Sequence, residues 1–357
     1  MPPKLSLQKK IGFTCAYTPL PLIDAAGFVP YRILPMTNAP DLAGQLMHDN
    51  MCPHVKKIID RALGADIPSL EGVIFMNSCD AMRRACDAWG KIKPEQQVMS
   101  VDLPPISNER SHQFFAEQLQ QLARDLSGLS GQVITADKLQ TSCAKYEKLF
   151  EMMQKIRVLV SQGQFAGGSP ALQELYNTLV TESLDITLPL VENLLMRAQA
   201  TPQSTADKKI PLFIFGNVIP DPEVFALFES CGARLVADDL CTGSRVFNKL
   251  NFNPSANNLF LELATSLLNR TPCARTIDPH NPDRLAQNIL AEAKKWEVKG
   301  VIGYTVKFCD PYLAKLPRIR EVLRDEGMPH LLLEGDCTTR SLGQQRTRIE
   351  AFIEMLG

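Results

Sequence analysis

Short apolar runs alternate with amphipathic helical stretches in both halves of the chain, and this alternation constrains the fold most. In the first half the pattern predicts three buried strands, over Tyr31–Pro35, Gly72–Asn77 and Gln97–Asp102. Helices are predicted between and around them, over residues 19–26, 54–63 and 81–89. Strands that alternate with helices form a parallel sheet with right-handed crossovers, so the first half is expected to be an α/β domain.

The second half repeats this alternation. It contains four predicted strands and a closing amphipathic helix, over Ile210–Gly216, Ala233–Asp238, Val301–Val306, His330–Glu334 and residues 346–356. Between the halves, residues 109–200 carry apolar side chains at three- and four-residue spacing, which predicts helices. A polar, proline-containing stretch over 199–209 is the expected linker. We therefore expect an N-terminal α/β domain over 1–108, a helical region over 109–200 and a C-terminal α/β domain over 208–357.

Composition and charge narrow the class of protein. Apolar residues make up 45% of the chain and charged residues 22%, which is ordinary for a soluble globular protein. A net charge of −1 gives no electrostatic basis for binding nucleic acid or an anionic membrane, so neither is expected as a partner. No apolar stretch approaches the roughly 18 residues of a membrane span, and the N-terminus lacks a signal-peptide pattern. The chain is expected to be cytoplasmic, where its ten cysteines would stay reduced.

Four of the ten cysteines closely follow predicted strands. They are Cys79, Cys241, Cys309 and Cys337. Ligands of open α/β sheets bind outside the carboxyl ends of the strands, so these thiols are expected to face a cleft. A fifth cysteine, Cys52, precedes a proline at the predicted start of a helix. The helix dipole at such a position lowers the pKa of a thiol and favours metal binding.

The chemistry of these thiols indicates a metal, but the residues alone leave a second interpretation open. Soft thiolate ligands favour an iron–sulfur cluster or zinc over hard cations. The chain has no CxxC pair, so Cys52, Cys79 and Cys309 could instead be buried thiols, and Cys15 fits either interpretation. Ordinary structural roles are expected for four other cysteines, Cys86, Cys143, Cys231 and Cys273. A Walker A loop, a GxGxxG motif and a GxSxG elbow are all absent from the sequence.

A series of short motifs is specific when its members are taken together and in order. They are Ile11–Tyr17 with Leu22–Gly27, Cys52–Lys56, Asn77–Asp80 with Arg83, Gly216–Asn217, Asp238–Arg245, Val306–Pro311 and Gly343–Phe352. In this combination the sequence resembles the 2-hydroxyacyl-CoA dehydratase D-component family, which is related to subunits of the ATP-dependent benzoyl-CoA reductases. The resemblance covers nearly the whole chain.

The resemblance implies two Rossmann-like domains with a [4Fe–4S] cluster in the cleft between them, held by Cys52, Cys79 and Cys309. Three protein thiolates would leave one iron open, and that iron could bind a substrate oxygen as a Lewis acid. The implied reaction is dehydration of a 2-hydroxyacyl-CoA to an enoyl-CoA, an iron–sulfur lyase reaction through a ketyl radical. A separate ATP-hydrolysing iron–sulfur activator would inject the electron, and the chain would act in a homodimer or heterodimer.

The surplus of cysteines leaves two alternatives to this assignment. Related double-cubane cluster proteins hold an [8Fe–9S] cluster, which needs more than three thiolates. If Cys15, Cys241 and Cys337 join the first three cysteines, the chain would be an ATP-coupled reductase of small molecules. The other alternative is a non-catalytic, cluster-binding accessory subunit. About four irons per chain would indicate the dehydratase, and about eight would indicate the double cubane.

Overall fold

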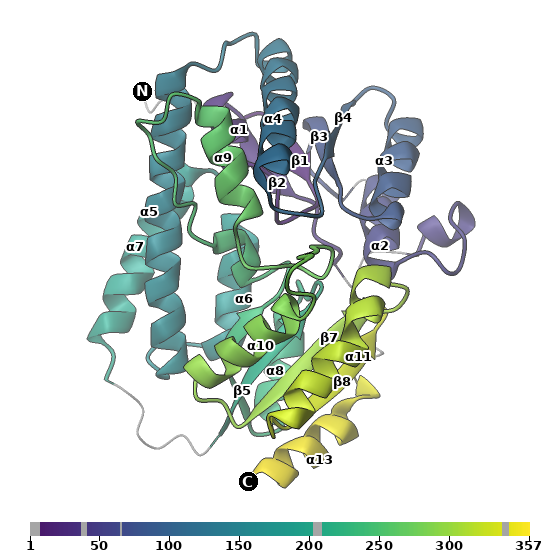
Figure 1. The fold of residues 1–357 in the computed structure, drawn as a ribbon, viewed down its shortest axis with the longest axis vertical. Helices are drawn as coiled ribbons and strands as arrows, with labels where there is room; N and C mark the ends of the chain where they lie inside the picture. The colour runs from purple at the N-terminus through teal and green to yellow at the C-terminus, as the bar shows by residue number, and fades with distance from the viewer. Residues whose placement is uncertain (1–7, 37–40, 65, 203–208, 338–342) are drawn as a thin grey trace.

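The computed structural model describes residues 8–36, 41–64, 66–202, 209–337 and 343–357. Its framework is a pair of four-stranded sheets in which all strand pairs are parallel. The first sheet contains β1 (Lys10–Phe13), β2 (Val29–Arg32), β3 (Leu70–Asn77) and β4 (Gln97–Asp102). The second contains β5 (Ile210–Gly216), β6 (Ala233–Asp239), β7 (Gly300–Val306) and β8 (His330–Gly335). The prediction of two parallel-sheet α/β units separated by a helical region is confirmed (Figure 1).

Both sheets have the same strand order. It is β2-β1-β3-β4 in the first sheet and β6-β5-β7-β8 in the second. A topological switch point therefore lies between β1 and β3, and another between β5 and β7. The two halves are structural counterparts, although their sequences show no repeat. The sequence patterns did not predict β1, because a four-residue strand with Gly12 inside it carries too little periodicity.

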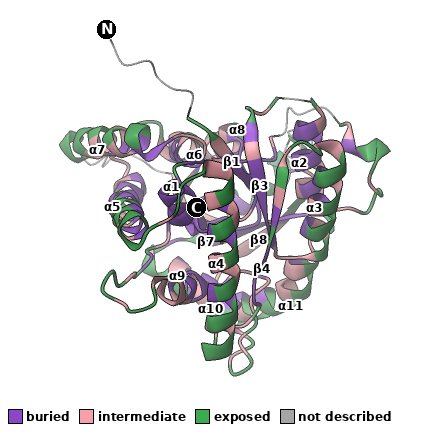
Figure 2. Ribbon diagram, turned by 90° about the horizontal axis from the view of Figure 1, so that it is seen from above, coloured by how far each residue is buried: buried purple, intermediate pink, exposed green. Residues whose placement is uncertain are grey.

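Helices cover both faces of each sheet. Around the first sheet lie α1 (Leu20–Ala25), α2 (Pro53–Gly64) and α3 (Asp80–Ile92), and around the second lie α8 (Pro222–Ser230), α10 (Arg284–Lys295), α11 (Asp310–Asp325) and α13 (Arg346–Leu356). Their apolar faces provide the cores, as where Ile58 of α2 and Trp89 of α3 belong to one buried cluster with Phe75. Figure 2 shows the buried strands enclosed by helices whose outer surfaces are exposed.

The helical region ties the two α/β units together. It consists of α4 (Glu109–Ser130), α5 (Ala136–Ser161), α6 (Gly168–Leu179) and α7 (Leu184–Ala200). The Asn108 side chain begins α4 by accepting a hydrogen bond from the Ser111 N–H at 2.9 Å. In one buried cluster, this region packs against the first sheet and against α9 (Leu259–Leu268), which comes from the second half of the chain. Figure 1 shows α9 beside α4.

A second apolar cluster extends across both sheets. Val73 of the first sheet and Leu212 of the second belong to the same group of buried side chains. The two sheets are thus joined by a continuous core as well as by the helical region. The part of the expected linker over 203–208 lies outside the described residues, and the domain boundaries remain a prediction. Among the described residues, no helix is long and apolar enough to cross a membrane.

Candidate metal centre

The carboxyl ends of the two sheets meet at one cavity of about 110 Å³, here called the interdomain cavity. Cys15 after β1 and Cys79 after β3 line it, and they flank the switch point of the first sheet. Asn217 after β5 and Cys309 after β7 line it from the other side, and they flank the switch point of the second sheet. Because α/β sheets bind ligands at their switch points, this cavity is the place where both sheets can act on one ligand.

Six of the ten cysteines line the interdomain cavity. They are Cys15, Cys52, Cys79, Cys241, Cys273 and Cys309. By their mutual electrostatic contacts they fall into two adjoining groups. The first triad is Cys52, Cys79 and Cys309, and the second triad is Cys15, Cys241 and Cys273. Each triad combines thiols from both halves of the chain.

The first triad lies at the starts of three helices. Cys79 and Cys309 are the N-cap residues of α3 and α11, and Cys52 immediately precedes α2. Burial raises the pKa of Cys52 to about 12 and that of Cys309 to about 11, and nearby backbone N–H groups oppose the shift. The expected lowering of the pKa at helix starts is therefore outweighed by desolvation. The Asn217 side-chain amide donates a hydrogen bond of 2.9 Å to the Cys309 sulfur.

The second triad has a different electrostatic character. A hydrogen bond from the Cys273 thiol, followed by the charges of Arg245 and Arg32, lowers the pKa of Cys241 to about 6. The same hydrogen bond, together with burial, raises the pKa of Cys273 well above its usual value. Burial also raises the pKa of Cys15. The protein thus stabilises one thiolate, on Cys241, within a group of three sulfurs.

The structure places the six sequence-predicted cysteines differently. Five of them line the interdomain cavity, whereas Cys337 is 4% exposed and packs into the core that joins the two sheets. Cys273, which was expected to be an ordinary structural thiol, lines the cavity in its place. Sequence patterns missed Cys273 because it follows no strand and starts no helix. Of the other cysteines, Cys143 is buried in the helical region, and Cys86 and Cys231 are half-buried outside the cavity.

Arg245 is held rigidly in the cavity wall. Its guanidinium forms two bonds to the Asp239 carboxylate, of 2.7 and 2.8 Å, and donates to the Tyr312 hydroxyl at 2.7 Å. It also donates to the Gly216 carbonyl at 3.2 Å and to the Cys241 sulfur at 3.4 Å. This geometry is a charge-assisted fork, which fixes the direction of the guanidinium toward the second triad.

The connection between α9 and α10 forms another part of the wall, and Arg275 fixes it to the first sheet. The Arg275 guanidinium donates to three backbone carbonyls, those of Ser78 (3.0 Å), Pro104 (2.9 Å) and Leu103 (2.6 Å). The Ile277 N–H adds a bond of 2.7 Å to the Pro105 carbonyl. These carbonyls follow β3 and β4, so Cys273 is held at the carboxyl edge of the first sheet.

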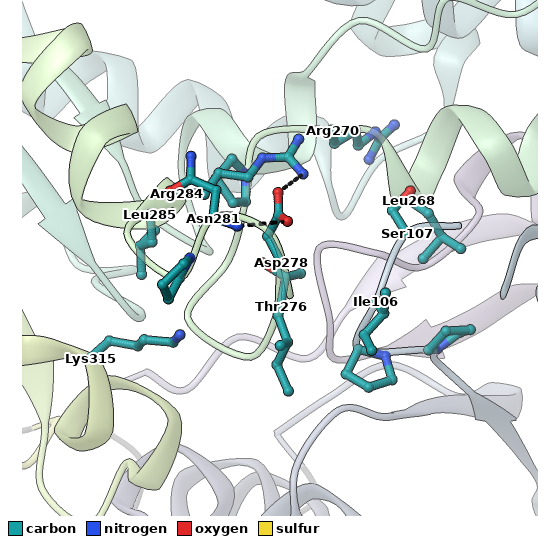
Figure 3. Close-up of a pocket in the computed structure, with 15 residues that line it drawn as sticks. Ile106, Ser107, Leu268, Arg270, Thr276, Asp278, Asn281, Arg284, Leu285 and Lys315 are labelled. Carbon is teal, nitrogen blue, oxygen red and sulfur yellow. Dashed lines mark hydrogen bonds and ion pairs between the residues drawn. The ribbon is translucent and has the colours of Figure 1, made fainter. Parts of the chain in front are cut away.

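A smaller concavity of about 20 Å³ is lined by neighbouring residues of the same connection (Figure 3). There Asp278 accepts hydrogen bonds from the Asn281 N–H and from Arg284, and Lys315 of α11 extends toward them. The volume suits little more than one water molecule. This concavity therefore has no room for a substrate, and its polar groups bind one another.

The donor set of the interdomain cavity suits an iron–sulfur cluster. Its described lining residues include six thiols and no carboxylate, and thiolates are the ligands that iron–sulfur clusters use. Within the described ranges, no three histidine, cysteine or carboxylate side chains lie close enough to hold one metal ion. A cubane spreads its ligands over different irons, so its thiolates stand farther apart than those of a zinc site. The cavity fits a cluster better than zinc.

Comparisons with known proteins cover nearly the whole chain. The family described as "2-hydroxyglutaryl-CoA dehydratase, D-component" matches residues 15–356. The (R)-phenyllactyl-CoA dehydratase beta subunit of Clostridium sporogenes is 26% identical over 354 residues, which are 98% of this chain and 92% of that protein. The beta subunit of (R)-2-hydroxyglutaryl-CoA dehydratase from Acidaminococcus fermentans is 22% identical over 98% of this chain and 93% of its own length. One of the benzoyl-CoA reductase subunits of Thauera aromatica is 22% identical over 91% and 84%, respectively.

Proposed function

The chain belongs to the 2-hydroxyglutaryl-CoA dehydratase D-component family, and from this premise we propose that it is the iron–sulfur subunit of an enzyme that acts in the interdomain cavity. The observation behind the proposal is the gathering of six thiols, from positions between 15 and 309, around one small space. Cysteines that serve only as small apolar residues have no physical reason to face a common cavity.

The number of thiols favours a cluster larger than one cubane. The first triad would hold one cubane through Cys52, Cys79 and Cys309. The second triad would hold another through Cys15, Cys241 and Cys273, so a double-cubane [8Fe–9S] cluster accounts for all six. Bound there, such a cluster would supply low-potential electrons and iron sites open to a substrate.

The size of the cavity favours reduction of a small molecule. Its volume of about 110 Å³ lies well below the roughly 300–1,000 Å³ of pockets that bind drug-sized ligands. An acyl group could not share that space with a cluster without a large opening of the cavity. The sequence carries no nucleotide-binding motif, so a separate ATP-hydrolysing iron–sulfur activator is the proposed source of the electrons.

The residues of the chain would control charge and water around the reaction. The core shared by the two sheets and the connection held by Arg275 close the cavity on several sides. Burial lowers the pKa of His54 to about 3, so its imidazole is neutral and can exchange a hydrogen bond without adding charge. Asn217 donates to the Cys309 sulfur and stabilises a thiolate at that position.

A second candidate function is dehydration of a 2-hydroxyacyl-CoA to an enoyl-CoA. The names of two relatives, dehydratases of phenyllactyl-CoA and 2-hydroxyglutaryl-CoA, favour it. In this case the first triad alone would hold a [4Fe–4S] cluster with one open iron, and the second triad would remain as free thiols. Those relatives are beta subunits, so we propose that this chain also pairs with a second subunit, identical or different.

Anaerobic iron and sulfide analysis of the purified chain, with electron paramagnetic resonance, tests the proposal. We expect about eight irons per chain for the double cubane, whereas about four would favour the dehydratase. The variant Cys79→Ser should lose iron and the brown colour while its circular dichroism stays unchanged. The matched control Cys86→Ser, seven residues along on α3 and outside the cavity, should retain both. A wild-type chain that binds no iron after reconstitution would sink the proposed function.

A further inference from the structure

The wall of the interdomain cavity carries positive charge that its described residues do not balance. Among these lining residues are Arg32, Arg245 and Arg275, but no aspartate or glutamate. Asp239, behind Arg245, neutralises that arginine through its two short bonds. Arg275 is half-buried and satisfies backbone carbonyls of the first sheet. Arg32 differs from both because it combines burial with the lack of a carboxylate partner.

Arg32 is the last residue of β2 and is only 1% exposed. Its guanidinium reaches across the cavity, donates to the Cys241 carbonyl at 2.5 Å and lies 6.0 Å from the centre of the Phe13 ring. Within the described part of the chain, no carboxylate lies within ion-pair distance of it. Burial lowers the pKa of Arg32, and the sulfurs of Cys241 and Cys15 oppose that shift.

A buried cation is costly to keep unless an anion balances it. The structure offers Arg32 only the sulfurs of the second triad as anionic neighbours. A metal cluster on those sulfurs would bring the missing negative charge, because the thiolates and sulfides of such clusters outweigh the charge of the irons. One-electron reduction then adds a further negative charge close to Arg32.

We propose that Arg32 balances the negative charge of the bound cluster and raises its reduction potential, an inference that rests on the proposed function. A fixed cation stabilises the reduced cluster more than the oxidised one, since the reduced form carries one more negative charge. The effect is strong here because the cavity wall excludes water and screens the charge little. Arg32 is thus a positioning residue for charge, and it need not touch the substrate.

The test is the midpoint potential of the iron-loaded protein, followed by electron paramagnetic resonance during an anaerobic redox titration. Arg32→Met keeps the length of the side chain and removes its charge. It should lower the midpoint potential by about tenfold in the ratio of reduced to oxidised cluster, or about 59 mV for a one-electron couple. Arg32→Lys should remain close to the wild type. In the matched control Arg61→Met the potential should not change, because Arg61 is buried on α2 outside the cavity and pairs with Asp66 at 3.1 Å.

The variant Arg32→Gln provides a second neutral side chain, with an amide that can still donate to the Cys241 carbonyl if Arg32→Met does not fold. An unchanged potential in a folded, iron-loaded neutral variant would overturn the inference. An equal drop in Arg32→Lys would overturn it too, because charge would then not be the cause. If the neutral variants bind no iron while Arg32→Lys does, the requirement for the charge is upheld. Absence of iron from the wild type would instead overturn the proposed function.

Discussion

Cys273 and Cys337 both lie in connections of the second half of the chain, yet only Cys273 reaches the interdomain cavity. Cys337 is buried among apolar side chains of the core, where burial raises its pKa well above the usual value. Cys273 donates its thiol proton toward Cys241, beside Arg245. Two cysteines that look alike in the sequence therefore have different chemistry, set by the groups around each sulfur.

The pair separates the two enzyme functions at the residue scale. Cys273→Ser should reduce the iron content from about eight toward about four per chain, because a second cubane would lose a ligand. Cys337→Ser should leave the iron content unchanged, since this sulfur lies outside the cavity. Iron analysis of both variants after the same anaerobic reconstitution provides the measurement. Equal iron contents in the two would contradict a role for Cys273 as a ligand.

Gly216, the last residue of β5, offers a second prediction at this scale. Its backbone has a φ of 152°, and a Cβ there would overlap the Tyr304 carbonyl of β7. Its own carbonyl accepts hydrogen bonds from Arg245 and Tyr312. Gly216→Ala should therefore lower the free energy of unfolding by about 3 kcal/mol or more.

The matched control for this substitution is Gly128→Ala on α4, where an added Cβ meets no atom within 4 Å. It should leave stability unchanged or raise it by about 0.5–1 kcal/mol, as alanine does in a helix. Denaturant unfolding of both variants supplies the numbers. A Gly216→Ala protein as stable as the wild type would show that β5 and β7 can separate at low cost.

At the scale of elements, the connection between α9 and α10 is held by a single side chain. Arg275 supplies three of its hydrogen bonds to the first sheet. Removal of that guanidinium would leave three carbonyls without their charged donor and free the connection to move. The element that carries Cys273 thus depends on a residue that lies two positions away from it.

Arg275→Met should lower the free energy of unfolding by about 2–4 kcal/mol and make the connection sensitive to protease. Arg284→Met is the matched control from the next helix. Its ion pair with Asp278 is 3.5 Å long and largely exposed, so its loss should cost less than about 1 kcal/mol. Urea unfolding and limited proteolysis of the metal-free chains measure both effects. Protease resistance in Arg275→Met would refute the role given to this arginine.

The elements also show what a sequence can predict. Ile210–Gly216 and Gln97–Asp102 were predicted with the bounds of β5 and β4, because buried parallel strands are continuous apolar runs. Cys52, Cys79 and Cys309 were found in the same way, since each directly flanks a regular element. Cys273 could not be found, because its place depends on Arg275 and on the packing of α9, which are contacts between distant parts of the chain.

For the whole molecule, the composition of the triads matters most. Cys52 and Cys79 of the first half share a triad with Cys309 of the second. Cys15 of the first half shares the other triad with two cysteines of the second. A cluster on these thiols would bind the two sheets to each other, in addition to the core that already joins them. Ligand binding at a shared site stabilises the closed arrangement by mass action.

Removal of the cluster should therefore loosen the junction between the sheets without unfolding either one. In hydrogen exchange, the loops after β1, β3 and β7 should exchange faster in the metal-free protein than in the iron-loaded protein. The interiors of α4 and α5 serve as internal controls and should exchange at the same rate in both. Equal exchange at the three loops would contradict a structural role for the cluster.

The origin of each triad in both halves also sets an order for biosynthesis. The ribosome releases Cys15, Cys52 and Cys79 long before Cys309, and domains fold from the N-terminus as the nascent chain emerges. The first triad is not complete until the start of α11 has been translated. Cluster insertion must then be a late event, and until it happens the newly made protein carries a row of unprotected sulfurs exposed to any oxidant in the cell.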